Sequence, residues 1–212
     1  MNYVDLSCRE YTEILASKSP CPGGGGTAAI TGALGCALGN MVGSLTVGKK
    51  RYADAEERIW VMKEEMTKFQ NRLLALAQKD TEVFGPLAEA YRLPQDTEEQ
   101  KKEKEEIMEE RLRSAAAVPL EIMEVCAHAI VLLEEFAEKG SRLAVSDAGC
   151  GARLCSAAMD CAALNVFINT KAMKDKAYAA ELESRANSIR RQFTARAEAV
   201  YGSVLTSLGG TR

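Results

Sequence analysis

Apolar residues recur three or four positions apart over long segments of this 212-residue chain. One series consists of Ile59, Met62, Met66, Phe69, Leu73 and Leu76. A second series consists of Ile122, Val125, Cys126, Ile130 and Leu133. This spacing places each series on one face of an amphipathic helix, and no segment shows the sustained alternation of a strand. The pattern predicts an all-α fold with six to eight helices, as one domain over residues 1–212.

Capping and breaking residues suggest where these helices begin and end. The first helix is expected near residues 5–16, the second from Thr27 and the last near 175–208. The expected N-terminal caps carry a side-chain oxygen that can accept from the first turn, and they are Asp54, Asp96 and either Ser146 or Asp147. Gly140 is expected to end a helix. Pro86 and Pro119 are expected to bend or end theirs.

The segment "SPCPGGGGTAAITGALGCALGNMVGSLTVGKKRY" contains no charged residue between Ser19 and Gly48. Its glycines formally match a dinucleotide-binding loop, but the preceding segment is predicted to be a helix and a turn, whereas such a loop follows a strand. Thirty uncharged residues could span a bilayer, but numerous glycines and the lack of aromatic anchors argue against a membrane helix.

A tightly packed helix explains this segment better. Gly32, Cys36, Gly39 and Gly43 leave one helix face almost without side chains, which allows a close neighbour. We therefore expect a glycine-rich helix at the centre of the bundle. Its N-terminus presents free N–H groups to an anion, and the cations at 49–51 follow its other end.

Composition narrows the function. A net charge of −3 without a basic stripe gives no reason to expect nucleic-acid binding. The seven cysteines lack zinc spacing and form no obvious disulfide framework. We expect them to be reduced and buried in a cytoplasmic protein, without a bound metal. The charged, amphipathic N-terminus does not have the features of a signal peptide.

Three blocks resemble the formiminotetrahydrofolate cyclodeaminase and methenyltetrahydrofolate cyclohydrolase family. They are "PGGGGTAAITGALGCALGNMVGSLTVGKKRY", "KDTEVFGPLAEAYRLP" and "VSDAGCGARLCSAAMDCAALNVFINT", in family order. Gly26 departs from the family's serine, and Ser141 from its asparagine. The resemblance implies an all-helical homodimer that acts on tetrahydrofolate one-carbon derivatives, with no cofactor besides this substrate.

Several residues are candidates for the chemistry. Asp80 lies beside the first apolar series, where a carboxylate is costly unless it is paired or functional. Because both lie in blocks that resemble the family, Asp80 and Asp147 are candidate acid/base groups or pterin anchors, and Lys49 is a candidate for proton transfer. The candidate substrate-binding residues are Gly23, Gly24, Gly25, Lys50, Arg51, Ser146, Asn165 and Asn169. Structural roles remain open for each, as helix caps, surface cations or interhelical hydrogen bonds.

The resemblance implies formiminotetrahydrofolate cyclodeaminase as the first expectation, and methenyltetrahydrofolate cyclohydrolase as the alternative. Without the resemblance, a non-enzymatic helical bundle that binds a partner would remain open. Asp147 and Asn165 lie five turns apart if one helix carries both, about 27 Å along its axis. We therefore do not expect them to contact the same small group within one chain.

Overall fold

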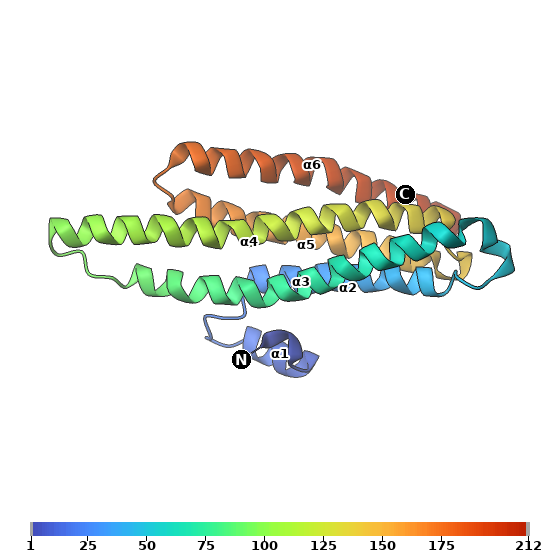
Figure 1. The fold of residues 1–212 in the computed structure, drawn as a ribbon, viewed down its shortest axis with the longest axis horizontal. Coiled ribbons are helices and arrows are strands. Elements are labelled where there is room, and N and C mark those ends of the chain that lie inside the picture. Colours follow the sequence, from blue (N-terminus) through green and yellow to red (C-terminus); the bar gives the residue numbers. More distant parts are fainter. Residues whose placement is uncertain (1, 211–212) are drawn as a thin grey trace.

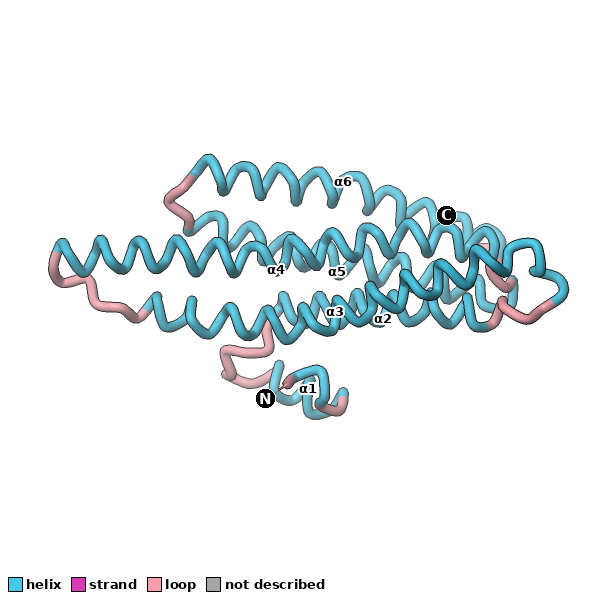
Figure 2. Tube along the Cα trace, viewed as in Figure 1, coloured by secondary structure: helices cyan, strands magenta, loops and turns pink. Residues whose placement is uncertain are grey.

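The computed structural model describes residues 2–210, which form six α-helices and three short 3-10 helices (Figure 1). The α-helices are α1 (Cys8–Leu15), α2 (Gly24–Ser44), α3 (Glu56–Tyr91), α4 (Glu98–Lys139), α5 (Val145–Ala172) and α6 (Lys176–Ser207). The 3-10 helices are η1 (Tyr3–Asp5), η2 (Lys50–Ala55) and η3 (Arg142–Ala144). No strand occurs within residues 2–210 (Figure 2). The predicted all-α fold is confirmed.

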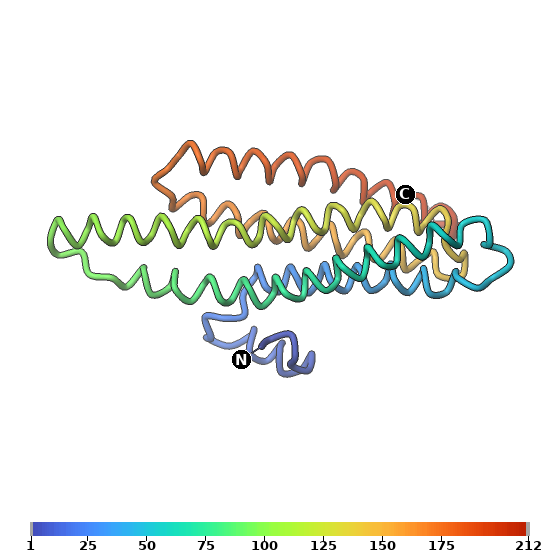
Figure 3. The backbone as a smooth tube through the Cα atoms, viewed as in Figure 1, coloured from blue at the N-terminus to red at the C-terminus, as the bar shows by residue number. Residues whose placement is uncertain are grey.

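Helices α2 to α6 run lengthwise in an elongated bundle, and α1 lies outside it near the start of α2 (Figure 3). Helix α5 packs against α2, α4 and α6, while α2 also packs against α3 and α4. The core is formed where these helices meet, and its largest fully buried side chains include Phe136, Met66, Leu73 and Met159.

Both apolar series face this core as predicted. In the first series every member except Phe69 is buried, and in the second every member except Val125 is buried. Phe69 and Val125 are half-buried and pack against the same cluster. The period of the sequence pattern therefore identified the buried faces of α3 and α4.

The predicted glycine face of α2 lies against neighbouring helices. A Cβ atom on Gly32 would lie 2.7 Å from Cys126 Sγ, and one on Gly35 would lie 2.9 Å from the Gly151 carbonyl oxygen. A Cβ atom on Gly39 would meet Met66 and Leu133 at 3.0 and 3.1 Å. These distances leave no room for a side chain, so the glycines allow close helix packing rather than space for a ligand.

Several predicted helix boundaries are wrong. Helix α3 begins at Glu56 without a side-chain cap, because η2 already includes Asp54. Helix α2 begins at Gly24 rather than Thr27. Helix α5 begins at Val145, so the candidate caps at 146 and 147 lie inside its first turn. In each case the residues just before the predicted start already adopt helical or 3-10 geometry.

At the start of α4 the capping box consists of Thr97 and Gln100, one residue beyond the predicted pair of Asp96 and Glu99. The Thr97 hydroxyl accepts the Gln100 N–H at 3.2 Å. The prediction that Gly140 ends this helix is confirmed.

The two interior prolines do not end their helices. Helix α3 continues through Pro86, and α4 continues through Pro119, which is buried. Each proline removes one backbone hydrogen bond from its helix, and the helix continues both at the exposed Pro86 and at the buried Pro119.

The prediction that the cysteines are buried is correct for only part of the set. Cys36, Cys126 and Cys155 are buried together between α2, α4 and α5, and all seven cysteines are free thiols. Cys8, Cys150 and Cys161 are exposed. Cys150 and Cys161 lie in an alanine-rich helix, where composition alone does not show which face meets solvent.

Two helical segments are long and apolar enough to cross a membrane, namely Glu98–Lys139 and Arg142–Ala172. Their apolar windows have mean hydropathies of 1.8 and 1.2, and 72% and 50% of these windows are buried in the bundle. Core helices of globular proteins pass the same criterion, so this observation is weak support for a membrane span.

Candidate active site

The first turn of α2 contacts Asp80 of α3. The Gly26 N–H donates a hydrogen bond to Asp80 Oδ2 at 2.8 Å. A Cβ atom on Gly25 would collide with all the carboxyl atoms of Asp80. Glycine at position 25 is therefore required for this carboxyl group to reach the end of α2.

The electrostatics of this end are those of an uncapped helix N-terminus. Gly23 is the N-cap residue and supplies no side-chain acceptor. The first N–H groups of a helix lack intrahelical partners and carry partial positive charge. Asp80 satisfies only one of them, at Gly26. The exposed Gly24 and half-buried Gly23 therefore leave backbone donors accessible for an anionic or carbonyl group of a ligand.

The Asp80 side chain is half-buried beside the start of α2. Burial raises the pKa of the Asp80 carboxyl group above its usual range, and the Gly26 hydrogen bond opposes this effect. No ion pair to Asp80 forms within the described part of the chain. A carboxyl group with a raised pKa holds its proton to higher pH than an exposed one.

Asn165 of α5 lies beside the same helix end. Its Nδ2 atom would lie 3.4 Å from a Cβ atom on Gly24, and it donates to the Cys161 carbonyl oxygen at 2.9 Å. Asn169 lies one turn further along and donates to the carbonyl oxygens of Asn165 and Ala115 at 2.8 and 3.1 Å. Asn165 is thus placed to meet a ligand at this end, whereas Asn169 links α5 to α4.

The other candidates lie beyond the C-terminal end of α2. Lys49, Lys50 and Arg51 are exposed where the chain passes into η2. Ser146 is exposed and Asp147 is half-buried in the first turn of α5. The two segments that carry these five residues meet at this end of the bundle, away from Asp80, and the five residues are called the second cluster.

A tyrosine holds the two segments of this second cluster together. The Arg142 N–H donates to Tyr52 Oη at 3.1 Å. This hydrogen bond is the main cause that lowers the pKa of Tyr52. Ser141, one of the departures from the family pattern, is buried and its N–H donates to Thr46 Oγ1 at 2.8 Å.

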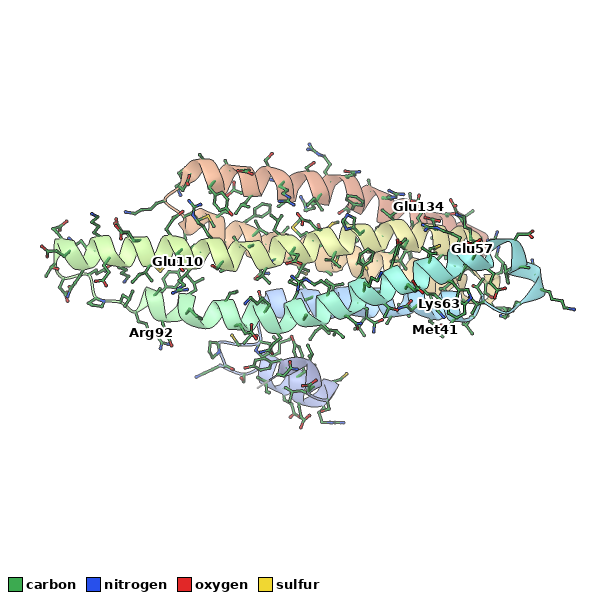
Figure 4. The ribbon with its side chains drawn as sticks, viewed as in Figure 1. Met41, Glu57, Lys63, Arg92, Glu110 and Glu134 are labelled. Atoms are coloured by element: carbon green, nitrogen blue, oxygen red, sulfur yellow. The ribbon has the colours of Figure 1, made fainter. Side chains whose placement is uncertain are left out.

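The two clusters lie at opposite ends of α2, because α2 and α5 are antiparallel. Gly24 lies beside Asn165, Gly35 beside Gly151, and the end of α2 beside the start of α5. A helix of 21 residues is about 30 Å long. Figure 4 shows Met41 and Lys63 at the end where α2 finishes, with Arg92 and Glu110 toward the other end. Within one chain the clusters do not meet.

The only histidine, His128, is exposed on α4 and stacks on Phe69 with ring centroids 5.9 Å apart. It lies on α4, which supplies no residue to either cluster. Residues 2–210 contain no group of three or more metal-ligating side chains suited to a metal ion.

Sequence reasoning missed residues that the structure brings to these clusters. Tyr11 of α1 and Thr27 of α2 join the Asp80 cluster, with their hydroxyl oxygens 3.1 Å apart. Tyr52 and Arg142 join the second cluster. Little in the sequence connects Tyr11 with this cluster, because it is a single tyrosine on a short amphipathic helix just before the glycines.

The chain is similar to known proteins over most of its length. The sequence profile of the family described as formiminotransferase-cyclodeaminase matches residues 7–188. A methenyltetrahydrofolate cyclohydrolase of Methylorubrum extorquens is 38% identical over 92% of this chain and 93% of its own length. The formimidoyltransferase-cyclodeaminase of Mus musculus is 30% identical over 95% of this chain, which spans only 37% of that protein.

Among solved structures, a formiminotetrahydrofolate cyclodeaminase from Thermotoga maritima superimposes with a TM-score of 0.80 at 30% identity, over 97% of both chains. Fold, length and sequence similarity thus agree with the three blocks noted in the sequence. The chain belongs to the formiminotransferase-cyclodeaminase family.

Proposed function

We propose that this protein is a formiminotetrahydrofolate cyclodeaminase. The observation that carries the proposal is the Asp80 carboxyl group, held at the uncapped end of α2 in a chain that belongs to this family. In the reaction, N10 of the folate attacks the formimino carbon on N5. The formimino nitrogen, which carries one hydrogen, gains two protons, one lost by N10 and one from a general acid, and leaves as ammonia. The methenyl bridge that forms carries the positive charge.

Asp80 fits the proton transfers of this reaction. Because burial raises its pKa, the carboxyl group binds a proton more tightly than an exposed aspartate does, which favours a role as the general acid for the leaving amine. Once ionised, it offers a negative charge to the methenyl cation. The free N–H groups of α2 and the Asn165 amide are suited to orient polar groups of the pterin.

A second candidate function is methenyltetrahydrofolate cyclohydrolase, which adds water to the methenyl bridge and yields the 10-formyl compound with release of a proton. The relative that favours it is the cyclohydrolase of matching length at 38% identity. The same carboxylate would then act as the base that activates water. The methenyl compound is the product of the first reaction and the substrate of the second, so the fold does not distinguish the two functions.

We also propose that the protein is a homodimer formed through α2 and α5, which would make α2 a central helix of the assembly. Large apolar side chains remain exposed on these two neighbouring helices, namely Leu34 at 56%, Met41 at 49%, Leu164 at 68% and Ile168 at 69%. Exposed apolar patches of this kind are typical of interaction surfaces.

A dimer offers a reason for two separate clusters. If the two copies pack antiparallel, the Asp80 end of one protomer faces the other end of its partner. The cations at 49–51 and Asp147 of the partner subunit would then complete the site, with Lys49 in proton transfer and Lys50 and Arg51 toward the glutamate tail. We place this one-domain enzyme in the cytoplasm and propose no cofactor besides its folate substrate.

The test uses purified protein and the near-ultraviolet absorbance of the methenyl bridge. Appearance of this absorbance from 5-formiminotetrahydrofolate, with ammonia release, supports the cyclodeaminase. Accelerated loss of absorbance from methenyltetrahydrofolate alone supports the cyclohydrolase. Asp80→Asn should lower either activity about 10²- to 10⁴-fold. Asp160→Asn, which removes an equal charge on α5 at a surface ion pair with Arg190, should not. Silence from folded wild-type protein would refute both functions.

A further inference from the structure

The hydroxyl group of Tyr11 lies at the Asp80 cluster although it belongs to α1, outside the bundle. A Cβ atom on Gly26 would lie 3.7 Å from Asp80 Oδ2 and 3.9 Å from Tyr11 Oη. Both oxygens therefore border the same small space at the start of α2. Since Gly26 stands where the family pattern has a serine, a tyrosine hydroxyl from another segment borders the space that this serine would occupy.

The hydrogen bonds of the Thr27 hydroxyl show that Tyr11 is the donor in the contact between the two side chains. The Thr27 hydroxyl donates its single proton to the Gly23 carbonyl oxygen at 2.8 Å. The contact between Thr27 Oγ1 and Tyr11 Oη, at 3.1 Å, then requires Tyr11 to be the donor. The lone pairs of Tyr11 remain available, so this oxygen presents an acceptor to the space that it shares with Asp80.

The Tyr11 side chain lines an apolar pocket between α1 and the bundle, together with Tyr3, Leu6, Leu15, Ile30 and Leu74. Tyr3 helps to fix the segment after α1, because its hydroxyl donates to the Cys21 carbonyl oxygen at 3.3 Å. The Tyr11 hydroxyl is thus positioned by its hydrogen bond to Thr27.

We propose that Tyr11 is a positioning residue of this site, whose hydroxyl oxygen, oriented by Thr27, accepts a hydrogen bond from the protonated carboxyl group of Asp80, directly or through one water. This inference rests on the proposed function, since it concerns the proton that Asp80 delivers. By stabilising the protonated form of Asp80, the Tyr11 hydroxyl keeps the proton on the carboxyl group, in position for transfer to the leaving amine.

The surroundings of Asp80 support this direction of effect. The groups that face it are Tyr11 from α1, Cys21 from the connecting segment, the Gly26 N–H from α2 and the uncharged Asn165 amide near that N-terminus. On α3 itself, Lys79 pairs with Glu82 at 3.6 Å. Burial raises the pKa of Tyr11, with a smaller contribution from the charge of Asp80, so the phenol stays neutral.

The test measures the titration of Asp80 without relying on turnover. Aspartate is labelled with ¹³C at the carboxyl carbon, the Asp80 signal is assigned by its loss in Asp80→Asn, and its midpoint is compared between wild type and Tyr11→Phe. Loss of one stabilising hydrogen bond should lower the midpoint by several tenths of a pH unit to about one unit. The pH profile of kcat should shift in the same direction.

Thr27→Val supplies a second variant that keeps the shape of the side chain. It frees the Tyr11 proton to reach the ionised carboxylate, so it also lowers the midpoint, but it should have no effect in a Tyr11→Phe background. An unchanged or raised midpoint in folded Tyr11→Phe overturns the inference. If wild type turns over neither folate while the midpoint still falls, the proposed function fails and the Tyr11–Asp80 interaction stands.

Discussion

The contact between Gly32 of α2 and Cys126 of α4 gives a quantitative test of close packing. Gly32→Ala adds a Cβ atom 2.7 Å from Cys126 Sγ and 3.2 Å from Leu73 Cδ1. Overpacking of this kind costs about 1–3 kcal/mol, and alanine recovers up to about 1 kcal/mol of helix propensity. We expect a net loss of about 1–2 kcal/mol in the free energy of unfolding.

The matched control removes the atom that the new methyl group strikes. Cys126→Ala alone deletes one buried sulfur and should cost about 1 kcal/mol, by analogy with a buried methylene. In the double variant the new methyl occupies the vacated space, so the total loss should stay near that of Cys126→Ala alone. The expected coupling is about 1–2 kcal/mol. Urea unfolding at one fixed protein concentration measures the stability of the two single variants and the double variant. If the two single losses add up to the loss of the double variant within about 0.5 kcal/mol, the contact is refuted.

Four further predictions concern the site, the surface and a helix cap. Asp80→Asn should lower kcat about 10²- to 10⁴-fold. Because burial raises the pKa of Asp80, the ionised carboxyl destabilises the native state, so wild type should lose stability as pH rises through this pKa. Urea unfolding at several pH values checks this, and an equal slope in Asp80→Asn contradicts it. Leu164→Glu should convert the proposed dimer to monomers in sedimentation velocity, because it places a charge in the α5 patch; a persistent dimer excludes that face. Thr97→Ala should cost about 1 kcal/mol by removing the cap on Gln100; an unchanged unfolding midpoint argues against the capping box.

The sequence was sufficient for the fold where one periodicity extends over many residues. The buried face of α3 follows from six apolar positions, and the helix continues through the exposed Pro86. Helix starts were harder to predict. Asp54 has the right spacing for a cap, but the preceding residues fold into η2 and move the start to Glu56. The local sequence does not show which helix start is preferred, because this depends on how the connecting segment crosses the end of the bundle.

The candidate site was predictable to a different degree at each end. Asp80 stood out because a carboxylate borders an apolar stripe, and the glycines at 23–25 stood out as uncapped helix donors. Their contact depends on how α2 and α3 pack, which no local pattern encodes. Tyr11 could not be connected with Asp80, because 69 positions separate them in the sequence and the contact requires α1 to fold back beneath α2.

The antiparallel arrangement of α2 and α5 links these observations. It brings Asn165 to the Asp80 end and leaves Asp147 with the cations at the opposite end, about 30 Å away. In a monomer, the polar groups near Asp80 and those near Asp147 would therefore stay at opposite ends of the bundle, although both sets lie in the blocks that resemble the family. An antiparallel pair of chains brings opposite ends together twice, so it would form two equivalent sites. Loss of the dimer should accordingly reduce activity even when Asp80, Gly26 and Tyr11 stay in place.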